Sequence, residues 1–409
     1  MFFTEYFKFA RANAQLVGFG FLMTFTSSFG QTYFIGVFGP SLQAEFDLSH
    51  SAWGSIYMAG TLASAALLPW TGKLIDRLDL RLYTASVIIL LSVACFLIAA
   101  TSTPLMLIAV VFLLRHSGQG LANHTAITTM ARYFDTGRGR AIAIATLGIT
   151  VGQAILPFAA VVGIVAIGWR WSYTGVGLVT LFVLLPTAFW LLKGHAVRHT
   201  RHMARYAAAA GTRAAESWTR SQVIRDIRFW LMLPGLTAPA LILTAMFFHH
   251  LSVAEAKGWS AAWITGNYLV FSIAIVVTSL VAGPLIDRIG AARLVPLMLV
   301  PLAVSMVAIG WGQHQFWVLP YFLLAGASAG LSMTAVAALW PELYGTGHLG
   351  AIKSLVASIS VFASALGPVI MGGLMDYGLS IDSICHMFAA VTLLGTACMF
   401  CAVRFTRLG

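Results

Sequence analysis

The sequence predicts an all-α polytopic membrane protein, with twelve transmembrane helices in two pseudo-symmetric six-helix bundles. The chain of 409 residues is 59% hydrophobic and only 9% charged, whereas about 25% of the residues of a soluble domain are charged. So few charged residues cannot cover a water-facing surface, which indicates a membrane protein. The apolar stretches are long and continuous, unlike the ~10-residue alternating segments of a transmembrane barrel, and therefore predict helices. An internal repeat divides these helices into two halves.

Twelve apolar stretches separated by polar residues are the candidate membrane spans. Several are longer than the ~20 residues that cross a bilayer, so we expect those helices to be tilted or to project from the membrane. The predicted spans are 15–38, 51–71, 82–100, 104–130, 140–165, 171–192, 229–252, 260–283, 294–311, 316–340, 351–373 and 380–403.

The distribution of Lys and Arg predicts the orientation of these spans. If the N-terminus lies in the cytoplasm, the basic residues of the loops gather on the cytoplasmic side, and only Arg170 and Lys257 are found outside. Because positively charged loops face the cytoplasm, we expect both termini there, with the protein in the bacterial inner (plasma) membrane. The net charge of +11 follows from this bias. It suits the lipid head groups of the bilayer and does not indicate binding to nucleic acid.

One long polar segment separates the first six spans from the last six. We predict an N-terminal six-helix bundle over 1–192, a cytoplasmic linker loop over 193–226 and a C-terminal six-helix bundle over 227–409. No nucleotide loop, catalytic triad or metal-binding motif occurs in the sequence. We therefore expect no enzyme activity, no catalytic residues, no cofactor and no bound metal.

The linker is basic, rich in alanine and contains several histidines. His195, His199 and His202 would share one face if this segment formed a helix. A metal site is one interpretation of that spacing. We favour the other, a basic helix that lies on the inner membrane surface.

A repeated loop follows the second and the eighth span. The first copy reads LPWTGKLIDRLDLR over 68–81, and the second reads SLVAGPLIDRIGAAR over 279–293. A second pair of matching segments, at the start of the fifth and eleventh spans, aligns with nearly the same offset. The chain therefore consists of two similarly oriented six-helix halves, as in transporters built from parallel repeats.

These loops carry the clearest family resemblance. The first copy resembles the inner-loop signature of the major facilitator superfamily, Gly-x-x-x-Asp-Arg/Lys-x-Gly-Arg, although Asp79 stands at the second glycine position. GWR at 168–170 and the Arg-x-x-Gly pattern at 115–118 are similar to the superfamily too, and the resemblance covers essentially the whole chain. It implies a monomeric transporter that works by alternating access. The conformational-gating residues that it implies are Gly72, Asp76, Arg77, Arg81, Gly283, Asp287 and Arg288.

Physical reasons support these gating residues. Glycines allow close helix approach near the inner face. A carboxylate at Asp76 or Asp287 would be stabilised by ~0.3–1 kcal/mol at the N-terminal end of a helix from the other half. Such contacts would latch the inner face and release when it opens. The alternative is that these are only solvated turn charges.

The substrate site of such a fold lies near the bilayer midplane, where polar side chains are costly unless they are functional. All thirteen acidic residues fall at loops or span ends, but Arg115 lies ~16 Å into the fourth span. Arginine stays charged in proteins and needs a partner. A substrate carboxylate would complete the pairing, and bonds to backbone carbonyls are the alternative.

Other polar residues share this predicted cavity. In a regular helix Arg115, Gln119 and Asn123 form one polar stripe at i, i+4 and i+8, and His124 beside them is a candidate for proton coupling. The alternative for His124 is a neutral histidine that bonds between helices. Polar mid-span residues such as His250 and Tyr321 rank below the predicted set. Substrate-binding candidates on other spans are Gln31, Tyr33, Gln153, Asn267 and Tyr268.

We therefore predict a secondary active transporter of a small organic anion, a carboxylate in particular, with H⁺ as a candidate coupling ion. The sequence as a whole is weakly similar to the monocarboxylate and oxalate–formate porter branch. Those relatives have a key arginine within the eighth span, whereas here the first basic residue is Arg288, at the end of that span. The alternative is a proton-coupled efflux transporter for multiple drugs or amphiphiles, which the many aromatic and methionine residues also fit. The absence of a central acidic residue argues against it, because such exporters commonly use an embedded carboxylate.

Overall fold

The chain divides into two compact helical units. The computed structural model describes residues 2–134, 137–194, 218–345 and 348–405, and every regular element within them is a helix. Unit 1 consists of Met1–Ser41 and Ala59–Thr212, and unit 2 of Leu42–Met58 and Arg213–Gly409. Because α5 (His50–Thr71) crosses residue 58, it begins in unit 2 and ends in unit 1.

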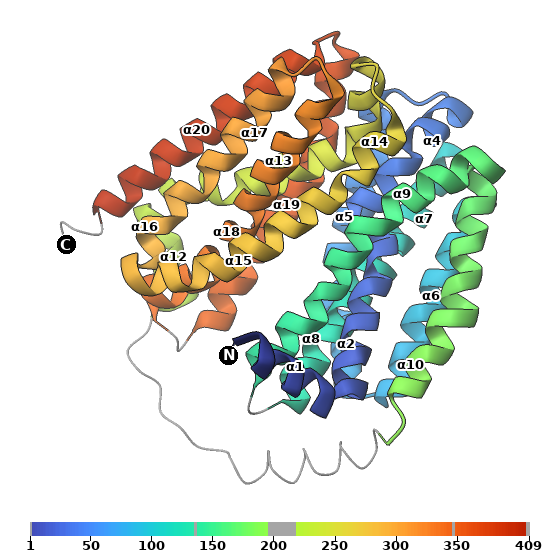
Figure 1. Cartoon of the computed structure of the whole chain (residues 1–409), viewed down its shortest axis with the longest axis horizontal. Helices are drawn as coiled ribbons and strands as arrows, with labels where there is room; N and C mark the ends of the chain where they lie inside the picture. Colours follow the sequence, from blue (N-terminus) through green and yellow to red (C-terminus); the bar gives the residue numbers. More distant parts are fainter. Residues whose placement is uncertain (1, 135–136, 195–217, 346–347, 406–409) are drawn as a thin grey trace. The chain divides into compact units, whose positions relative to one another are not determined.

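Unit 1 contains most of the first half of the chain, drawn mainly in blue to green in Figure 1. Its helices are α1 (Phe2–Ala12), α2 (Ala14–Ser27), η1 (Ser28–Gly30), α3 (Thr32–Ile35), η2 (Gly36–Phe38), η3 (Gly72–Asp76), α6 (Leu80–Ala99), α7 (Pro104–Leu114), η4 (Arg115–Ala122), α8 (Asn123–Tyr133), α9 (Arg138–Val179), η5 (Thr180–Leu184) and α10 (Leu185–Leu191). The short helix α4 (Gly39–Phe46) leads from unit 1 into unit 2.

Unit 2 adds the start of α5 to the second half of the chain, drawn in yellow-green to red in Figure 1. Its other helices are α12 (Arg220–Arg225), α13 (Ile227–Ala256), α14 (Ala261–Gly266), α15 (Tyr268–Ile289), α16 (Ala291–Leu294), η6 (Val295–Leu299), α17 (Val300–Trp311), η7 (Gln315–Trp317), α18 (Val318–Tyr344), α19 (Leu349–Asp376) and α20 (Ile381–Phe405).

Nine helical stretches of the described residues are long and apolar enough to cross a membrane. One of them, Arg138–Leu191, covers two predicted spans, because helical backbone hydrogen bonding continues on both sides of a kink at Gly168, whose φ is +79°. The first predicted span is not among the nine because it is divided into short pieces, and α5 is not among them either. Most of the predicted linker, with its three histidines, lies outside the described residues.

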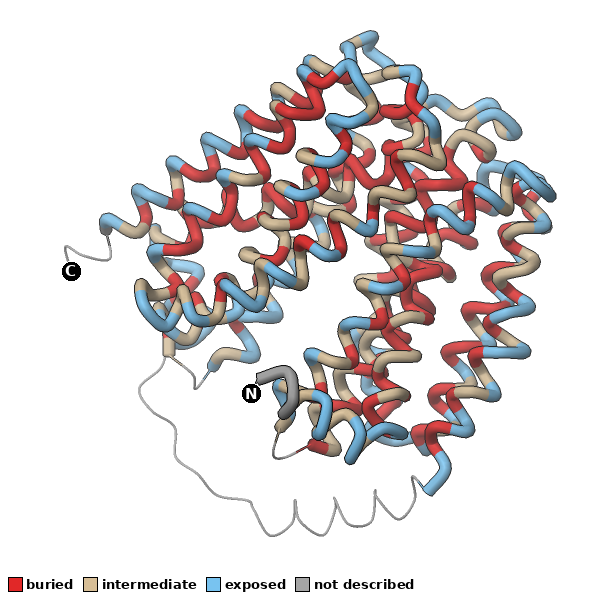
Figure 2. The backbone as a smooth tube through the Cα atoms, in the orientation of Figure 1, coloured by how far each residue is buried: buried red, intermediate tan, exposed pale blue. Residues whose placement is uncertain are grey.

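Large apolar side chains lie exposed in stripes along the long helices. On α20, Met387, Val391 and Leu394 recur at i, i+4 and i+7 and are 44–65% exposed, while the opposite side of the helix is buried (Figure 2). A water-soluble monomer rarely exposes apolar surface in continuous patches. In a bilayer the same stripe contacts lipid chains, so this pattern agrees with an integral membrane protein.

Small residues bring neighbouring helices of each unit close together. On α9, Gly148 and Gly152 are four residues apart and face Phe21 and Ser28 of the first span. On α18, Gly326 and Gly330 have the same spacing and face α15. Since lipid removes the hydrophobic drive for helix association, close van der Waals contact across such small-residue pairs is the main alternative source of stability. Both units use this spacing.

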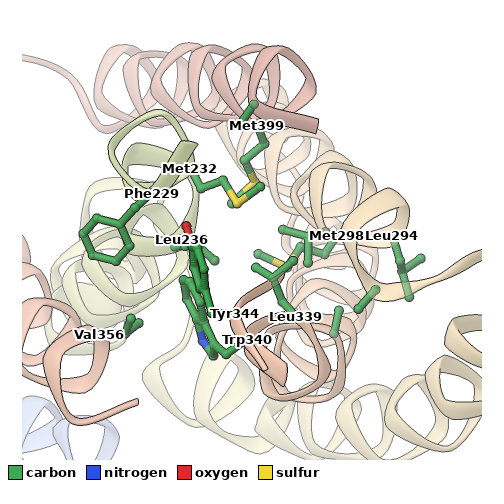
Figure 3. Close-up of a cluster of buried hydrophobic side chains, with 14 of the residues drawn as sticks. Phe229, Met232, Leu236, Leu294, Met298, Leu339, Trp340, Tyr344, Val356 and Met399 are labelled. Carbon is green, nitrogen blue, oxygen red and sulfur yellow. The ribbon is translucent and has the colours of Figure 1, made fainter. Parts of the chain in front are cut away.

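A cluster of buried apolar side chains joins several elements of unit 2. Met232 and Phe229 of α13 lie with Met399 of α20 and with Trp340 and Tyr344 of α18 (Figure 3). Flexible methionine side chains suit the irregular space between the aromatic rings. Asp226 ties this cluster to the start of α13, because its carboxylate accepts hydrogen bonds from the Arg228 backbone N–H at 3.0 Å and from the Tyr344 hydroxyl at 3.0 Å.

Candidate functional site

The first predicted span is interrupted in its middle. Helix α2 ends at Ser27, a 3₁₀ turn follows, and Gln31 has an extended backbone with φ −85° and ψ 155°. In a regular helix the Gly30 carbonyl would accept from the Phe34 N–H, but that N–H bonds to the Gln31 carbonyl at 3.1 Å instead. The break therefore leaves the Gly30 carbonyl without its helical donor inside the membrane protein, and such a carbonyl needs another partner.

The fourth predicted span is irregular at the place where it meets this break. Rather than one α-helix, it consists of α7, the π-helical segment η4 and α8. A Cβ atom added to Gly118 of η4 would lie 2.7 Å from the Cα and N atoms of Gly30. The two irregular segments thus touch through a pair of glycines. Discontinuous helices and π-helical turns are frequent at functional sites.

Arg115 supplies the donor that the broken span lacks. Its guanidinium Nη1 donates to the Gly30 carbonyl at 3.0 Å, and its Nε donates to the Thr61 hydroxyl of α5 at 3.2 Å. The side chain is only 4% exposed. Of the two partners that the sequence allowed, backbone carbonyl or substrate anion, this conformation shows the carbonyl. One buried cation therefore links the first, second and fourth spans.

Four further predicted residues of unit 1 lie on the elements around the break. Gln31 is the extended residue itself, and the backbone N–H of Gln119 lies against Gly30. The Tyr33 hydroxyl donates to the Ile149 carbonyl of α9 at 3.4 Å, and Gln153 follows on α9 one turn later. Gln31, Gln119 and Gln153 are half-buried, so their amides remain partly accessible.

The predicted polar stripe on the fourth span lies on a segment that is not an α-helix. The prediction assumed α-helical spacing from Arg115 to Asn123, but η4 is π-helical over Arg115–Ala122, with i to i+5 bonds. Arg115 is buried at the break, while Gln119 and Asn123 are half-buried. The sequence shows no feature that separates this π segment from an ordinary helix.

The two histidines of the fourth span have separate surroundings. His116 is buried, stacks on Phe112 and bonds through Nε2 to the Thr71 hydroxyl at 3.1 Å. His124 is half-buried, lies 3.4 Å from the Thr128 hydroxyl and faces Gly72 of the repeated loop. The candidate for proton coupling thus lies beside the repeated loop rather than at the break.

The repeated loop of unit 1 forms the 3₁₀ turn η3 and a set of polar contacts. Asp76 makes an ion pair with Arg132 at the end of α8, and Arg81 donates to the Leu192 carbonyl at 2.9 Å. Asp79, at the second glycine position of the signature, accepts from the Arg81 backbone N–H at 2.8 Å and so begins α6 as its N-cap. The departure from the signature therefore has a structural role. Arg77 is exposed.

The second copy of the loop is built differently. Helix α15 runs through Gly283, Asp287 and Arg288 and ends at Ile289, before Gly290, whose φ is +83°. The carboxylate of Glu342 on α18 accepts from the backbone N–H groups of Ala291 at 2.7 Å and Ala292 at 3.3 Å. A carboxylate at this helix start is stabilised by the helix dipole. Within unit 2, Glu342 takes this place, while Asp287 and Arg288 are exposed.

Unit 2 holds a second polar cluster in its interior. Tyr268, a predicted binding residue, is fully buried, and its hydroxyl lies 2.7 Å from Nδ1 of His250. Nε2 of His250 lies 2.7 Å from the Tyr321 hydroxyl. Asn267, next to Tyr268, donates to the Trp263 carbonyl at 2.8 Å, a bond within its own helical turn. Ionisable residues inside membrane spans are often functional, and this rule makes His250 a candidate from the sequence alone. Its two tyrosine partners are visible only in the structure.

The family of the chain follows from comparison with known proteins. A sequence model of the Major Facilitator Superfamily matches residues 20–272 and, overlapping, 253–407. The chain belongs to the Major Facilitator Superfamily.

Individual members of the superfamily are similar over most of the chain. The gallate transporter of Pseudomonas putida is 28% identical over 384 residues, which cover 85% of this chain and 82% of the relative. The MFS-type transporter YcxA of Bacillus subtilis (strain 168) is 26% identical over 408 residues, which cover 93% and 95%. The crystal structure of the nucleoside transporter NupG superposes with a TM-score of 0.73 over 95% of this chain and 98% of that chain, at 11% identity.

These similarities establish what kind of protein this is. The chain is an integral membrane transporter of the superfamily with an all-α polytopic fold, and it is not an enzyme. Its substrate is a small molecule that it moves across a lipid bilayer. At 11% identity, the likeness to NupG shows the fold alone.

Proposed function

We propose that this transporter carries a small organic anion, a carboxylate, by alternating access, with Arg115 as the residue that binds the anion. The observation that carries the proposal is the buried guanidinium at the break of the first span, bonded to a neutral carbonyl and a neutral hydroxyl. A carboxylate adds the attraction of an opposite charge and can accept two parallel hydrogen bonds from the guanidinium, which a neutral carbonyl or hydroxyl oxygen does not. A carboxylate is therefore the partner for which Arg115 would most readily exchange the Gly30 carbonyl.

Comparison with relatives supports the same class of substrate. Gallate, the substrate in the name of the Pseudomonas putida relative, is an aromatic carboxylate. Three amides lie on the elements around Arg115, those of Gln31, Gln119 and Gln153. Amide groups both donate and accept, so they suit the hydroxyl or carbonyl groups of a polar carboxylate.

Substrate binding would act on the two irregular segments. In this conformation, Arg115 holds the broken span against η4 through Gly30. When the guanidinium turns to a carboxylate, the Gly30 carbonyl loses this donor, and the break and the π-helical segment become free to rearrange. A ligand shifts an equilibrium only through its different affinity for the two states, and this exchange of partners supplies such a difference.

The gating motif supports the alternating-access part of the proposal. The side chains of Asp76 and Arg132 are 62% and 23% exposed. An ion pair that is this accessible to water contributes roughly 0–1 kcal/mol. It can therefore hold the end of unit 1 in one arrangement and release at little cost. We place this end, together with both chain termini, in the cytoplasm, in accord with its basic residues.

A thermal-shift screen of the purified protein tests the substrate class. The panel contains gallate, benzoate, aliphatic monocarboxylates, amino acids, a nucleoside and cationic dyes. We expect carboxylates to raise the melting temperature, because a ligand at 100 times its Kd adds about 2.7 kcal/mol of stability. The same shift should be absent in Arg115→Lys, which keeps the charge but loses the bidentate fork. Stabilisation by cationic dyes alone would contradict the proposal and favour amphiphile efflux.

A further inference from the structure

His250 lies between two tyrosines at the centre of unit 2. Its Nδ1 and Nε2 atoms are each 2.7 Å from a phenol oxygen, those of Tyr268 and Tyr321. The three side chains come from α13, α15 and α18 and are at most 1% exposed. The rings of Phe247 and Phe322 stand edge-on to the imidazole, with centroids 4.8 and 5.4 Å away. An ionisable residue in the interior of a membrane protein suggests a function in transport.

The two phenols allow His250 to gain or lose a proton without losing a hydrogen bond. A neutral imidazole has one N–H donor and one acceptor nitrogen, so one tyrosine donates to the ring and the other accepts from it. When a proton adds to the acceptor nitrogen, both nitrogens donate and both phenol oxygens accept. The hydroxyl hydrogen that had pointed at the ring then turns away from it. In each form both ring nitrogens are hydrogen-bonded to the same two phenols.

The neighbouring histidine is held by a different kind of partner. Nε2 of His249 lies 2.9 Å from the Pro368 carbonyl of α19. A carbonyl only accepts, so this bond fixes the proton on Nε2 in both forms of the ring. The two adjacent, equally buried histidines therefore differ in the chemistry of their partners, which makes His249 a matched control for His250.

The titratable groups around His250 come from every side of the unit. His249 is on the same helix, Tyr268 and Tyr321 contact the ring, and Cys385 of α20 interacts with Tyr321. His50 and Asp376 act on His249 at the end of the unit where α5 begins. Beyond the end of α13, Lys257 is paired with Asp382 at 2.7 Å. Within the described part of the chain, the groups that act directly on the His250 ring include no carboxylate, so a proton there would add a positive charge to an otherwise neutral cluster.

We propose that His250 is the proton-binding residue of the coupled transport cycle, an inference that rests on the proposed transport of an organic anion. A proton from water adds to the acceptor nitrogen of the ring, and one phenol hydroxyl reorients so that its oxygen accepts from the new N–H. Burying an isolated imidazolium is costly. Its charge is balanced when a monocarboxylate is carried in the same cycle, so proton and anion move together without net charge.

Two transport assays on the full-length protein in proteoliposomes separate coupling from transport. Counterflow of gallate at equal pH needs binding and exchange of substrate only. Accumulation of gallate against its gradient, with the outside acidic, also needs the proton. We expect His250→Gln to retain counterflow and to lose accumulation, because glutamine can bond to both tyrosines but binds no proton. The control His249→Gln should retain both activities.

The outcomes distinguish this inference from the proposed function. If His250→Gln accumulates gallate as the wild type does, His250 does not carry the proton, and anion transport stands. If the wild type exchanges no carboxylate, the proposed function fails, and proton binding is measured without substrate. In that case a pH jump of the detergent-purified protein between about 8 and 5 should show less proton uptake by His250→Gln than by the wild type. Equal proton uptake by the two proteins would overturn the inference.

A variant that preserves the packing covers the case in which His250→Gln does not fold. The change Tyr321→Phe keeps all three rings and removes one acceptor oxygen. An imidazolium would then be buried with one nitrogen unpaired, so we expect accumulation to fall while counterflow continues. Unchanged accumulation in this variant would overturn the inference equally.

Discussion

At the scale of single residues, Arg115 has two roles that compete for the same donors. It satisfies the Gly30 carbonyl at the break and contacts the Thr61 hydroxyl, so it stabilises the arrangement of three spans. We propose that it also binds the carboxylate of the substrate. When such a residue exchanges a structural partner for the substrate, substrate binding also changes the structure of the protein. A residue without a structural partner would not link the two.

The structural role of Arg115 predicts a loss of stability in Arg115→Ala. Removing the side chain leaves the Gly30 carbonyl buried without a donor, which costs about 1–3 kcal/mol. Arg115→Lys keeps one charged donor and should lose less. Melting temperatures of the purified variants measure both effects, with Arg225→Ala, at an exposed position on α12, as the control. Equal melting temperatures for Arg115→Ala and the wild type would show that this hydrogen bond contributes nothing.

Sequence reasoning finds Arg115 but not its partner. An arginine in the middle of an apolar segment is visible in the sequence, and so is the lack of a nearby acidic residue. The Gly30 carbonyl is a backbone atom, and its need for a donor arises only because the Phe34 N–H bonds elsewhere. His250 is similar, because its significance depends on two tyrosines that come from distant parts of the chain.

At the scale of elements, the contact between the broken first span and the π-helical segment defines the candidate site. Long apolar runs predict continuous helices. No proline occurs next to Gly30 or within η4, so the sequence does not predict that either helix is interrupted there. The irregular winding depends instead on how the two segments pack, with Gly30 and Gly118 in contact. Capped helix starts are easier to predict, as at Thr103 and Pro104, where α7 begins with a threonine cap and a proline.

The glycine contact predicts a difference between two Gly→Ala variants. A Cβ at Gly118 would lie 2.7 Å from backbone atoms of Gly30, so Gly118→Ala should destabilise unit 1 by about 1–3 kcal/mol and impair transport. At Gly175 of α9 the added Cβ would meet no neighbouring group of the described residues within 4 Å. Gly175→Ala should therefore leave melting temperature and transport unchanged or slightly improved. Similar behaviour of the two variants would contradict a tight contact at the break.

At the scale of the whole molecule, the repeat seen in the sequence corresponds to a family of known architecture. Composition and hydropathy suffice to predict an all-α membrane fold, because the bilayer permits few alternatives. The two units use similar helix contacts, such as the glycine pairs of α9 and α18. The polar interiors differ, with a cationic centre at Arg115 in unit 1 and a titratable one at His250 in unit 2. We propose that this division separates anion binding from proton binding.

Counterflow in proteoliposomes tests the central claim, that Arg115 binds a carboxylate substrate, most directly. Vesicles loaded with the unlabelled carboxylate that gives the largest thermal shift are diluted into a solution of the labelled compound. We predict rapid uptake of label by the wild type and none by Arg115→Lys, although both proteins are folded. Uptake by Arg115→Lys at the wild-type rate and with the same KM would contradict the account.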